Sequence, residues 1–253
     1  MDLCVLASGS RGNATLIKNK DTLILIDAGI SAKAITTRLA EIGIIPDDLD
    51  AIIISHEHGD HVNGVRVLTK KFNIPVWINA ATLKNIKEDW SSVKVNHFKI
   101  GSSFKVNSLS INPFYVSHDA EATSAFVVKN SSVAVGVATD LGDYTNLLIQ
   151  NFSKCDAIVL ESNYEDELLM KSSYPWKTKK RIRSRNGHLS NERSFELIKK
   201  ISKFKRLKHV ILAHISQKNN SVEHLKSHIK KFPEKQIKLY LSFQDKISEV
   251  IKL

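Results

Sequence analysis

The sequence predicts an α/β protein in which two packed β-sheets are flanked by helices. Short apolar segments recur along the 253-residue chain and end in polar residues, which is typical of strands buried on both faces. The two halves of the chain also repeat one order of elements, and segments predicted to be helical are attached to the strands in each half. These observations favour two similar sheets, each covered by its own helices.

The internal repeat runs strand, Asp, Gly, helix, strand and polar loop. In the first half the buried strand ends in Asp27 and Gly29, and in the second half it ends in Asp140 and Gly142. Two matched pairs in the same order are harder to produce by chance than one. The matched pairs are residues 22–29 with 133–142, and residues 50–55 with 156–161.

The remaining elements follow from apolar runs and from helix-start signals. Ser190 is expected to cap the helix that begins at Asn191. Further strands are predicted at 3–7, 14–18, 76–78, 95–98, 103–106, 109–116, 123–128 and 210–213. Helices are predicted at 32–42, 64–71, 146–152, 191–204, 221–232 and 242–251.

The length and composition indicate a single domain, residues 1–253. No apolar run approaches the roughly 20 residues of a membrane-spanning helix. No basic segment precedes the short apolar stretch at 3–7, which argues against a secretory signal. Cys4 and Cys155 lie in apolar segments and are interpreted as buried thiols. A cytoplasmic location is therefore expected, and no membrane partner.

The net charge of +11 favours polyanionic partners, above all nucleic acid. A proteome rich in lysine would explain the composition equally well. The segment 177–185 favours nucleic acid, because it carries six cations in nine residues and no acidic side chain. Four of these cations are predicted to bind substrate: Lys179, Lys180, Arg181 and Arg183.

A cluster of metal-ligand residues follows the apolar segment 51–55. His56, His58, Asp60 and His61 share one tight turn, and Gly59 is expected to permit close backbone approach there. Neutral imidazole and carboxylate suit Zn²⁺, Mn²⁺ or Fe²⁺. The alternative interpretation is a solvated polar loop, which would not require so many donors at one strand end.

Other ligand-type residues stand where other predicted strands end. His118 follows segment 109–116, Asp140 ends the second-half strand, and His214 follows segment 210–213. Each residue alone is more often a structural loop histidine or a capping aspartate. Their shared position at strand ends indicates one constellation.

These ordered motifs resemble the metallo-β-lactamase superfamily, and the resemblance spans nearly the whole chain. It implies a four-layer αββα sandwich of two mixed β-sheets flanked by helices. It also implies two metal ions, one held by His56, His58 and His118, and a second held by Asp60, His61 and His214. Asp140 would bridge the two ions, and Asp27 would orient the histidine-rich loop.

Smaller motifs are similar to the YycJ/WalJ group of bacterial metallo-hydrolases, which are related to DNA exonucleases. Arg11 departs from the small residue expected in the first motif, and the span from Asp140 to His214 is too short for an inserted second domain. The motifs lie at 7–13, 117–120, 186–191 and 213–216, followed by Asn219 and Asn220.

The resemblance implies a 5′–3′ DNA exonuclease that acts at DNA ends and uses two Zn²⁺ or Mn²⁺ ions with a bridging hydroxide as nucleophile. Asp60 and His188 are the expected catalytic residues. His188 would bind the scissile phosphate or protonate the leaving oxygen, although a structural loop histidine is an equal alternative. Asn13 and Ser216 are expected to donate hydrogen bonds to substrate.

Other functions fit the same motifs. The enzymatic alternatives are RNA processing and hydrolysis of a small phosphodiester or thioester. A different class is a nucleic-acid-binding protein with a structural metal site, which the open bridging position argues against.

Overall fold

Two seven-stranded β-sheets form the centre of the molecule in a computed structural model that describes residues 1–253. Both sheets contain parallel and antiparallel strands, as predicted. The first sheet has the order β14 (Ile251–Lys252), β1 (Asp2–Ala7), β2 (Ala14–Asn19), β3 (Thr22–Ile26), β4 (Ala51–Ile53), β5 (Val76–Asn79) and β6 (Val95–Phe98). The second has the order β13 (Lys238–Leu241), β12 (His209–Ala213), β11 (Ala157–Glu161), β10 (Ala134–Ala138), β9 (Ser124–Lys129), β8 (Leu109–Tyr115) and β7 (Phe104–Val106).

The strand pairings confirm the internal repeat. Strand β3 is antiparallel to β2 and parallel to β4, and β10 has the same relation to β9 and β11. The parallel strands β4, β5 and β6 correspond in turn to β11, β12 and β13. The two sheets therefore have matching strand orders, and equivalent strands lie in equivalent places.

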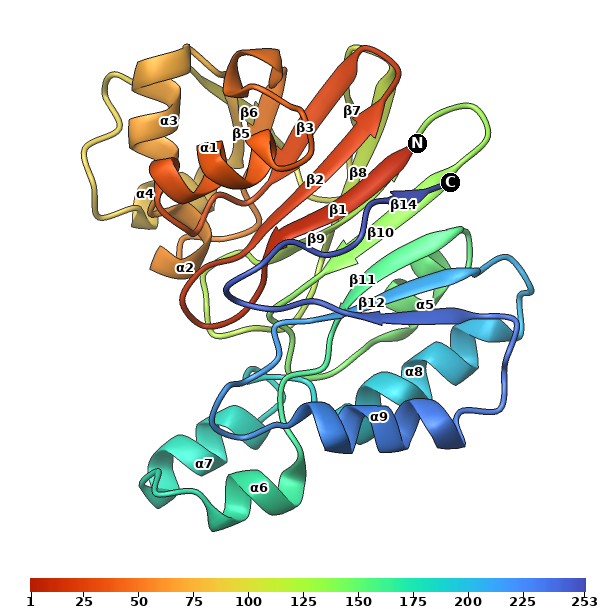
Figure 1. Cartoon of the computed structure of the whole chain (residues 1–253). Helices are drawn as coiled ribbons and strands as arrows, with labels where there is room; N and C mark the ends of the chain where they lie inside the picture. The colour runs from red at the N-terminus through yellow and green to blue at the C-terminus, as the bar shows by residue number, and fades with distance from the viewer.

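Helices cover the outer face of each sheet, which confirms the four-layer αββα sandwich. Figure 1 shows α1, α3 and α4 on one side of the molecule and α5, α8 and α9 on the other. The first group comprises α1 (Ala32–Ala40), α3 (Val65–Phe72) and α4 (Ala80–Asn85), with the short α2 (Gly59–Val62) and η1 (Pro46–Asp48) nearby in sequence. The second comprises α5 (Asn146–Phe152), α8 (Asn191–Ser202) and α9 (Val222–Lys231).

The apolar strands β4 and β11 are buried on both faces because alternate residues serve different layers. In β4, Ile52 packs in the cluster beneath the first group of helices, whereas Ile53 packs between the sheets. In β11, Ile158 packs beneath the second group of helices and Val159 packs between the sheets. This explains why both segments are continuously apolar rather than alternating.

Three of the helices have a serine as their N-cap residue. Ser190 accepts a hydrogen bond from the backbone N–H of Arg193, which confirms the predicted cap of α8. Ser31 and Ser221 cap α1 and α9 in the same way. Each side chain satisfies one of the N–H groups that a helix start leaves without a partner. No helix has the combination of length and apolar character that crossing a bilayer requires.

The helix predicted at 242–251 is wrong. This segment is an extended loop that leads into β14, and it is held by side-chain contacts with β1 and the following loop. The Ser248 hydroxyl accepts a hydrogen bond from the backbone N–H of Val5, and Gln244 bonds to the backbone of both Arg11 and Gly12. Such side-chain-to-backbone bonds replace the hydrogen bonds that a helix would have supplied.

Two helices form a projection that the sequence analysis did not predict. We call residues 163–189 the arm; it contains α6 (Asp166–Lys171) and α7 (Trp176–Arg183), which stand apart from both sheets in Figure 1. Tyr164, Leu169 and Ile182 make a small core of their own within it. Helix α7 was not predicted because the highly charged sequence 177–185 has only one buried apolar position, Ile182.

Candidate metal centre

The ligand-type residues of both sheets meet at one edge of the sandwich. His56, His58, Asp60 and His61 lie in the loop after β4 and in α2, whereas the other three follow β8, β10 and β12. These last three strands run in the same direction, so their carboxyl ends lie at the same edge. The three residues are His118, Asp140 and His214.

Three strand-end residues adopt a left-handed backbone conformation. The φ angles of Asp27, Asp140 and His214 are 59°, 58° and 52°. Non-glycine residues seldom adopt such angles, although Asp and His do so more readily than most. The conformation turns the chain out of the strand at the position of the functional side chain, and such local strain is typical of functional sites.

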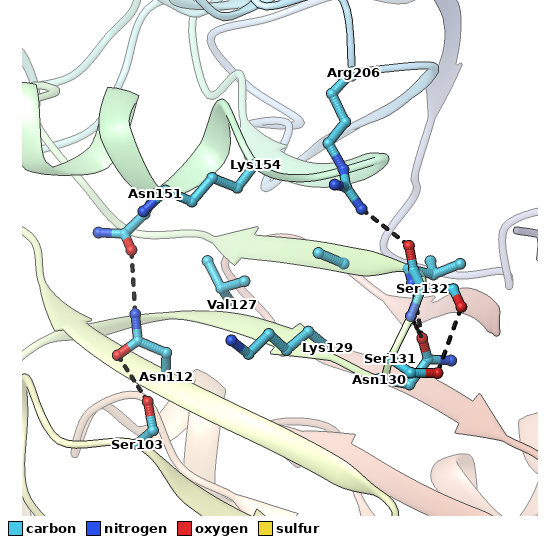
Figure 2. Close-up of a pocket in the computed structure, with 12 residues that line it drawn as sticks. Ser103, Asn112, Val127, Lys129, Asn130, Ser131, Ser132, Asn151, Lys154 and Arg206 are labelled. Atoms are coloured by element: carbon cyan, nitrogen blue, oxygen red, sulfur yellow. Dashed lines mark hydrogen bonds between the residues drawn. The ribbon is translucent and has the colours of Figure 1, made fainter.

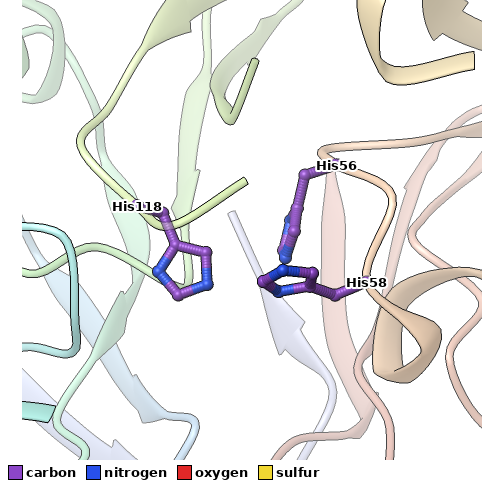
Figure 3. Close-up of side chains that lie close together, drawn as sticks. All are labelled: His56, His58 and His118. Carbon is purple, nitrogen blue, oxygen red and sulfur yellow. The ribbon is translucent and has the colours of Figure 1, made fainter. Parts of the chain in front are cut away.

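The first group of donors is a triangle of imidazoles. Figure 3 shows the rings of His56, His58 and His118 facing one another, with His118 on the loop that follows β8 of the second sheet. The ring centroids of His56 and His58 are 4.7 Å apart, and those of His118 lie 5.2 and 5.1 Å from them. One ligand atom from each ring can therefore reach a common ion.

The second group of donors surrounds Asp60. Its Oδ2 atom lies 3.6 Å from His61 Nε2 and 3.8 Å from His214 Nε2. Asp140 lies between the two groups, because its Oδ2 is 2.9 Å from His61 Nε2 and its Oδ1 is 3.7 Å from His118 Nε2. Ligand atoms at about 2.1 Å from a tetrahedral ion are about 3.4 Å from one another, so these spacings suit a metal ion.

Four buried atoms in the site form no hydrogen bond of good geometry: the Nε2 atoms of His56, His118 and His214, and Oδ2 of Asp140. Asp140 Oδ2 does lie close to His61 Nε2, and His118 Nε2 to Asp119, but neither contact has the direction of a hydrogen bond. In each of the three histidines the other ring nitrogen is engaged, with Ser55 Oγ, the Gly187 carbonyl and Glu161 Oε1 respectively. A buried polar atom without a partner costs about 1–3 kcal/mol, and several converging ones need a common partner. The donor set fits a divalent metal ion.

Asp27 lies behind the histidine-rich loop. One of its carboxylate oxygens is 2.7 Å from His61 Nδ1, and the other accepts a hydrogen bond from the backbone N–H of Ser55. The Ser55 hydroxyl also donates to Asp27 and contacts His56 Nδ1. Asp27 thus fixes the orientation of His61 directly and contacts His56 through Ser55, which leaves both Nε2 atoms facing the site.

Glu161 is a functional residue that the sequence analysis missed. It ends β11, is completely buried, and its Oε1 lies 2.8 Å from Nδ1 of both His188 and His214. Its Oε2 accepts hydrogen bonds from the backbone N–H groups of Leu141 and Leu189. Because both oxygens are occupied by donors, Glu161 orients two imidazoles rather than serving as a ligand. The available signal was a charged residue at the end of an apolar strand.

His188 borders the same site. Its ring centroid lies 5.3 Å from that of His118 and 5.1 Å from that of His214. Its side chain is 14% exposed, so it is open to a substrate to a degree that His118 and His214 are not. With Nδ1 bonded to Glu161, Nε2 is the nitrogen left for a substrate.

Burial and neighbouring charges divide the histidines into two groups. Burial lowers the pKa of His56 well below its usual value and lowers that of His118. Burial also acts to lower the pKa of His61 and His214, but at these two residues nearby carboxylates raise the pKa by more. Asp27, Asp140 and Asp60 raise the pKa of His61 well above its usual value, and Asp140 and Glu161 raise that of His214 to about 9.

We predict that the metal-free protein is most stable near pH 6.5, the pKa of an unfolded histidine. Above this pH the folded state binds more protons than the unfolded state at His61 and His214, so stability falls as pH rises towards about 9. Below it the unfolded state binds more protons at His56 and His118, so stability also falls. Melting temperatures of chelator-treated protein between pH 5 and 9 measure this; a melting temperature that rises from pH 7 to 9 contradicts it.

Asn13 and Ser216, which we expected to contact substrate, use their polar atoms within the protein. The Asn13 amide nitrogen lies 3.1 Å from His61 Nε2 and 3.4 Å from Asp60 Oδ2, and its oxygen accepts from the Gly9 N–H. The Ser216 hydroxyl accepts a hydrogen bond from the N–H of Asn219 in a local turn. Asn13 therefore lies against candidate ligands, and Ser216 shapes the loop after His214.

The glycine that close packing requires is Gly29 rather than Gly59. A Cβ atom on Gly29 would lie 1.6 Å from the Asp60 carbonyl oxygen, whereas one on Gly59 would meet only the Asn63 side chain, at 3.1 Å. The Asp60 loop rests directly on Gly29, and the backbone N–H of Asn13 bonds to the same carbonyl. A larger residue at Gly29 would push Asp60 out of the site.

The cations expected to bind substrate lie on α7 but point in different directions. Arg181 pairs with Asp119, and Arg183 pairs with Asp166 at 2.8 Å. The Lys179 ammonium group donates to the Met170 carbonyl, whereas Lys180 is exposed beside Trp176. Lys180 is thus the freest of the four, and Arg181 is the one nearest the metal centre, because Asp119 Oδ1 lies 3.2 Å from His118 Nε2.

The four-layer sandwich and the strand-end donor set together define a metallo-hydrolase of the β-lactamase type. The sequence matches the model of the Beta-lactamase superfamily domain over residues 22–215. The metallo-β-lactamase fold protein YhfI from Bacillus subtilis superposes with a TM-score of 0.74 at 16% identity, covering 98% of this chain and 99% of that one.

More specific similarity comes from two curated proteins. The exodeoxyribonuclease WalJ of Streptococcus pneumoniae is 36% identical over 87% of this chain and 83% of its own length. The exodeoxyribonuclease YycJ of Bacillus anthracis is 31% identical over 87% of this chain and 84% of its own length. The chain belongs to the metallo-β-lactamase superfamily and, within it, to the WalJ/YycJ group; it is a metal-dependent hydrolase.

Proposed function

We propose that this protein is a 5′–3′ DNA exonuclease and that the domain of residues 1–253 carries its complete active site. The observation that carries the proposal is the set of buried, unpartnered donor atoms beside an exposed basic arm. In metal-assisted phosphodiester hydrolysis a bound cation stabilises charge at the phosphate, and basic side chains hold the strand. The names of the relatives WalJ and YycJ support DNA as the substrate.

Two divalent ions, Zn²⁺ or Mn²⁺, fit the two groups of donors. His56, His58 and His118 would hold one ion; Asp60, His61 and His214 would hold the other, with Asp140 between them. When bound by these residues, such a pair of ions would supply an activated water as nucleophile and positive charge at the phosphate. The division of roles is supported by Asp140, which lies close to residues of both groups: His61 and His214 of the second, and His118 of the first.

His188 is proposed to act on the phosphate or on the leaving oxygen. Glu161 accepts a hydrogen bond from its Nδ1 at 2.8 Å, which directs Nε2 towards the substrate. A ring held in this way can carry a proton at Nε2 and donate it to the departing oxygen. The partial exposure of the side chain leaves room for this contact.

The test is cleavage of end-labelled DNA and RNA, in single-stranded and duplex forms and with the label at either end, by metal-loaded protein. We expect stepwise release of nucleotides from 5′ ends of DNA and no turnover by the Asp60→Ala variant. Cleavage of RNA alone would replace this proposal with RNA processing. If the protein hydrolyses only a small phosphodiester such as bis-p-nitrophenyl phosphate, nucleic acid is not its substrate.

Removing exposed charge from α7 is expected to weaken DNA binding and its dependence on salt. A cation that no longer neutralises a DNA phosphate reduces the salt slope by about one unit, so the double change Lys177→Gln and Lys180→Gln should lower it by about two. Neither lysine belongs to an ion pair of the structure. The measurement is DNA affinity at several salt concentrations.

A matched control lies at the other end of the molecule. Lys129, Lys154 and Arg206 line a polar cavity of about 520 Å³ near the starts of β10 and β11. Figure 2 shows these side chains. Lys129→Gln with Lys154→Gln removes the same total charge there. If both double variants lower the salt slope equally, DNA is held by the overall charge of the protein and the arm has no special part.

A further inference from the structure

Trp176 is an exposed indole that the arm holds in place. It is the first residue of α7, and 55% of its surface is exposed. Pro175 fixes the backbone before it, and the Lys180 ammonium lies 5.7 Å from the ring centroid. The ring takes no part in the small core of the arm. Packing of the arm therefore does not explain an aromatic residue at this position.

The indole shares its face of α7 with cations. At about 100° per residue, Trp176, Lys177, Lys180 and Arg181 lie on one side of the helix. Ile182 lies on the opposite side, where it is buried in the core of the arm. The exposed face of α7 thus combines an aromatic plane with positive charge, the combination with which proteins bind single-stranded nucleic acid.

The same helix reaches the metal centre. Arg181 pairs with Asp119, which borders His118, and the loop after α7 supplies the carbonyl of Gly187 that bonds to His118 Nδ1 at 3.0 Å. Trp176 precedes Arg181 by five residues, or about 7.5 Å along the helix axis. Stacked nucleotides are spaced about 3.4 Å apart along a strand, so the indole and Arg181 are separated along the helix axis by about two nucleotide spacings.

We infer that Trp176 is a stacking platform for a base of single-stranded nucleic acid, a few nucleotides from the phosphate at the metal centre. This inference rests on the proposed function and names its substrate as a single strand or an unpaired end. A base can stack on the indole only when its own face is free, whereas a blunt duplex covers the faces of all its bases except the outer face of the terminal pair, which would lie at the metal centre rather than at Trp176. The neighbouring lysines contact the phosphates and hold the strand along α7.

The test compares Trp176→Ala and Trp176→Phe in the binding of a single-stranded 20-nucleotide DNA, on an Asp60→Asn background that prevents cleavage. Loss of one stacked base weakens binding roughly 5- to 140-fold, so we expect a loss in this range for Trp176→Ala. Trp176→Phe retains an aromatic face and should recover most of the affinity. Binding of the blunt duplex should change less than about twofold in both variants.

A second measurement identifies the base. Single abasic positions are placed in turn near the 5′ end of the strand, and one of them should weaken binding to the parent protein as much as Trp176→Ala does. At that position the two changes together should cost no more than either alone, because both remove one contact. Phe204→Ala is the matched control: Phe204 is 58% exposed and flanked by cations, but it follows the far end of α8.

The inference is overturned if Trp176→Ala binds the single strand as the parent does, or if the losses from Trp176→Ala and from every abasic position simply multiply. If Trp176→Ala does not fold, the losses caused by abasic positions are compared between the parent protein and Trp176→Phe. The platform then predicts a loss at the same single position in both proteins. The outcome is separable from the proposed function. Loaded protein that cleaves DNA without a Trp176 effect refutes only the platform, whereas Trp176-dependent binding without cleavage refutes only the nuclease.

Discussion

The Asp140→Ala variant is expected to lose at least about 10³-fold in turnover, more than the removal of a single hydrogen-bond donor from an active site costs. The reason is the position of Asp140, whose carboxylate oxygens lie within 3.7 Å of His118 in the first group of donors and of His61 and His214 in the second. Its loss removes negative charge shared by both groups of donors. The bound metal, measured by elemental analysis after gel filtration, should fall together with the activity.

Asp156→Asn provides the control for this prediction. Asp156 also lies in the second sheet region, next to the start of β11, and pairs with Arg206 at 2.9 Å, far from the strand-end edge that carries the donors. It should retain metal and turnover. An Asp140→Ala protein that keeps half of the parent activity and its full metal content would refute the central position given to Asp140.

The His188→Ala variant is expected to lose about 10²-fold in kcat, the usual contribution of a general acid, with KM and metal content nearly unchanged. His188 contacts Glu161 and faces the site, but three other histidines carry the unpartnered buried nitrogens. A His188→Ala loss that appears only in KM would assign the residue to binding.

Glu161→Gln should have a broader effect than His188→Ala. Glu161 accepts four hydrogen bonds, two from imidazoles and two from backbone N–H groups. An amide offers only one acceptor oxygen, so at least one donor would face the new NH₂ group. Both kcat and metal retention should fall, because His188 and His214 lose the same support. His209→Ala, a histidine at the start of β12, is the matched control and should change neither.

The sequence predicted most of the fold because its strands are apolar on both faces and end abruptly in polar residues. The same feature indicated His118, Asp140 and His214, since each follows such a strand. Glu161 was not predicted because it acts through contacts with His188 and His214, which lie 27 and 53 positions later in the chain. No local sequence pattern indicates such contacts. The helices of the arm were not predicted for a different reason. Only Ile182 of α7 is buried, so its sequence lacks the apolar periodicity of a helix.

The one wrong helix had a physical cause as well. Segment 242–251 has a spacing compatible with a helix, but Gln244 and Ser248 are more than 230 residues from the backbone groups they bind. Such long-range hydrogen bonds override weak local preference. The segment also holds the loop 8–13, whose Asn13 lies against Asp60 and His61.

The contacts between segment 242–251 and the loop 8–13 have a consequence for the order of events during synthesis. A ribosome makes every candidate ligand up to His214 before it makes the residues that clamp the loop 8–13. The nascent chain therefore holds a full set of donors while one wall of the site is still unsupported. We expect it to remain inactive until residues 244–248 have emerged and bound the loop 8–13, so that activity appears only after the whole set of donors has been made.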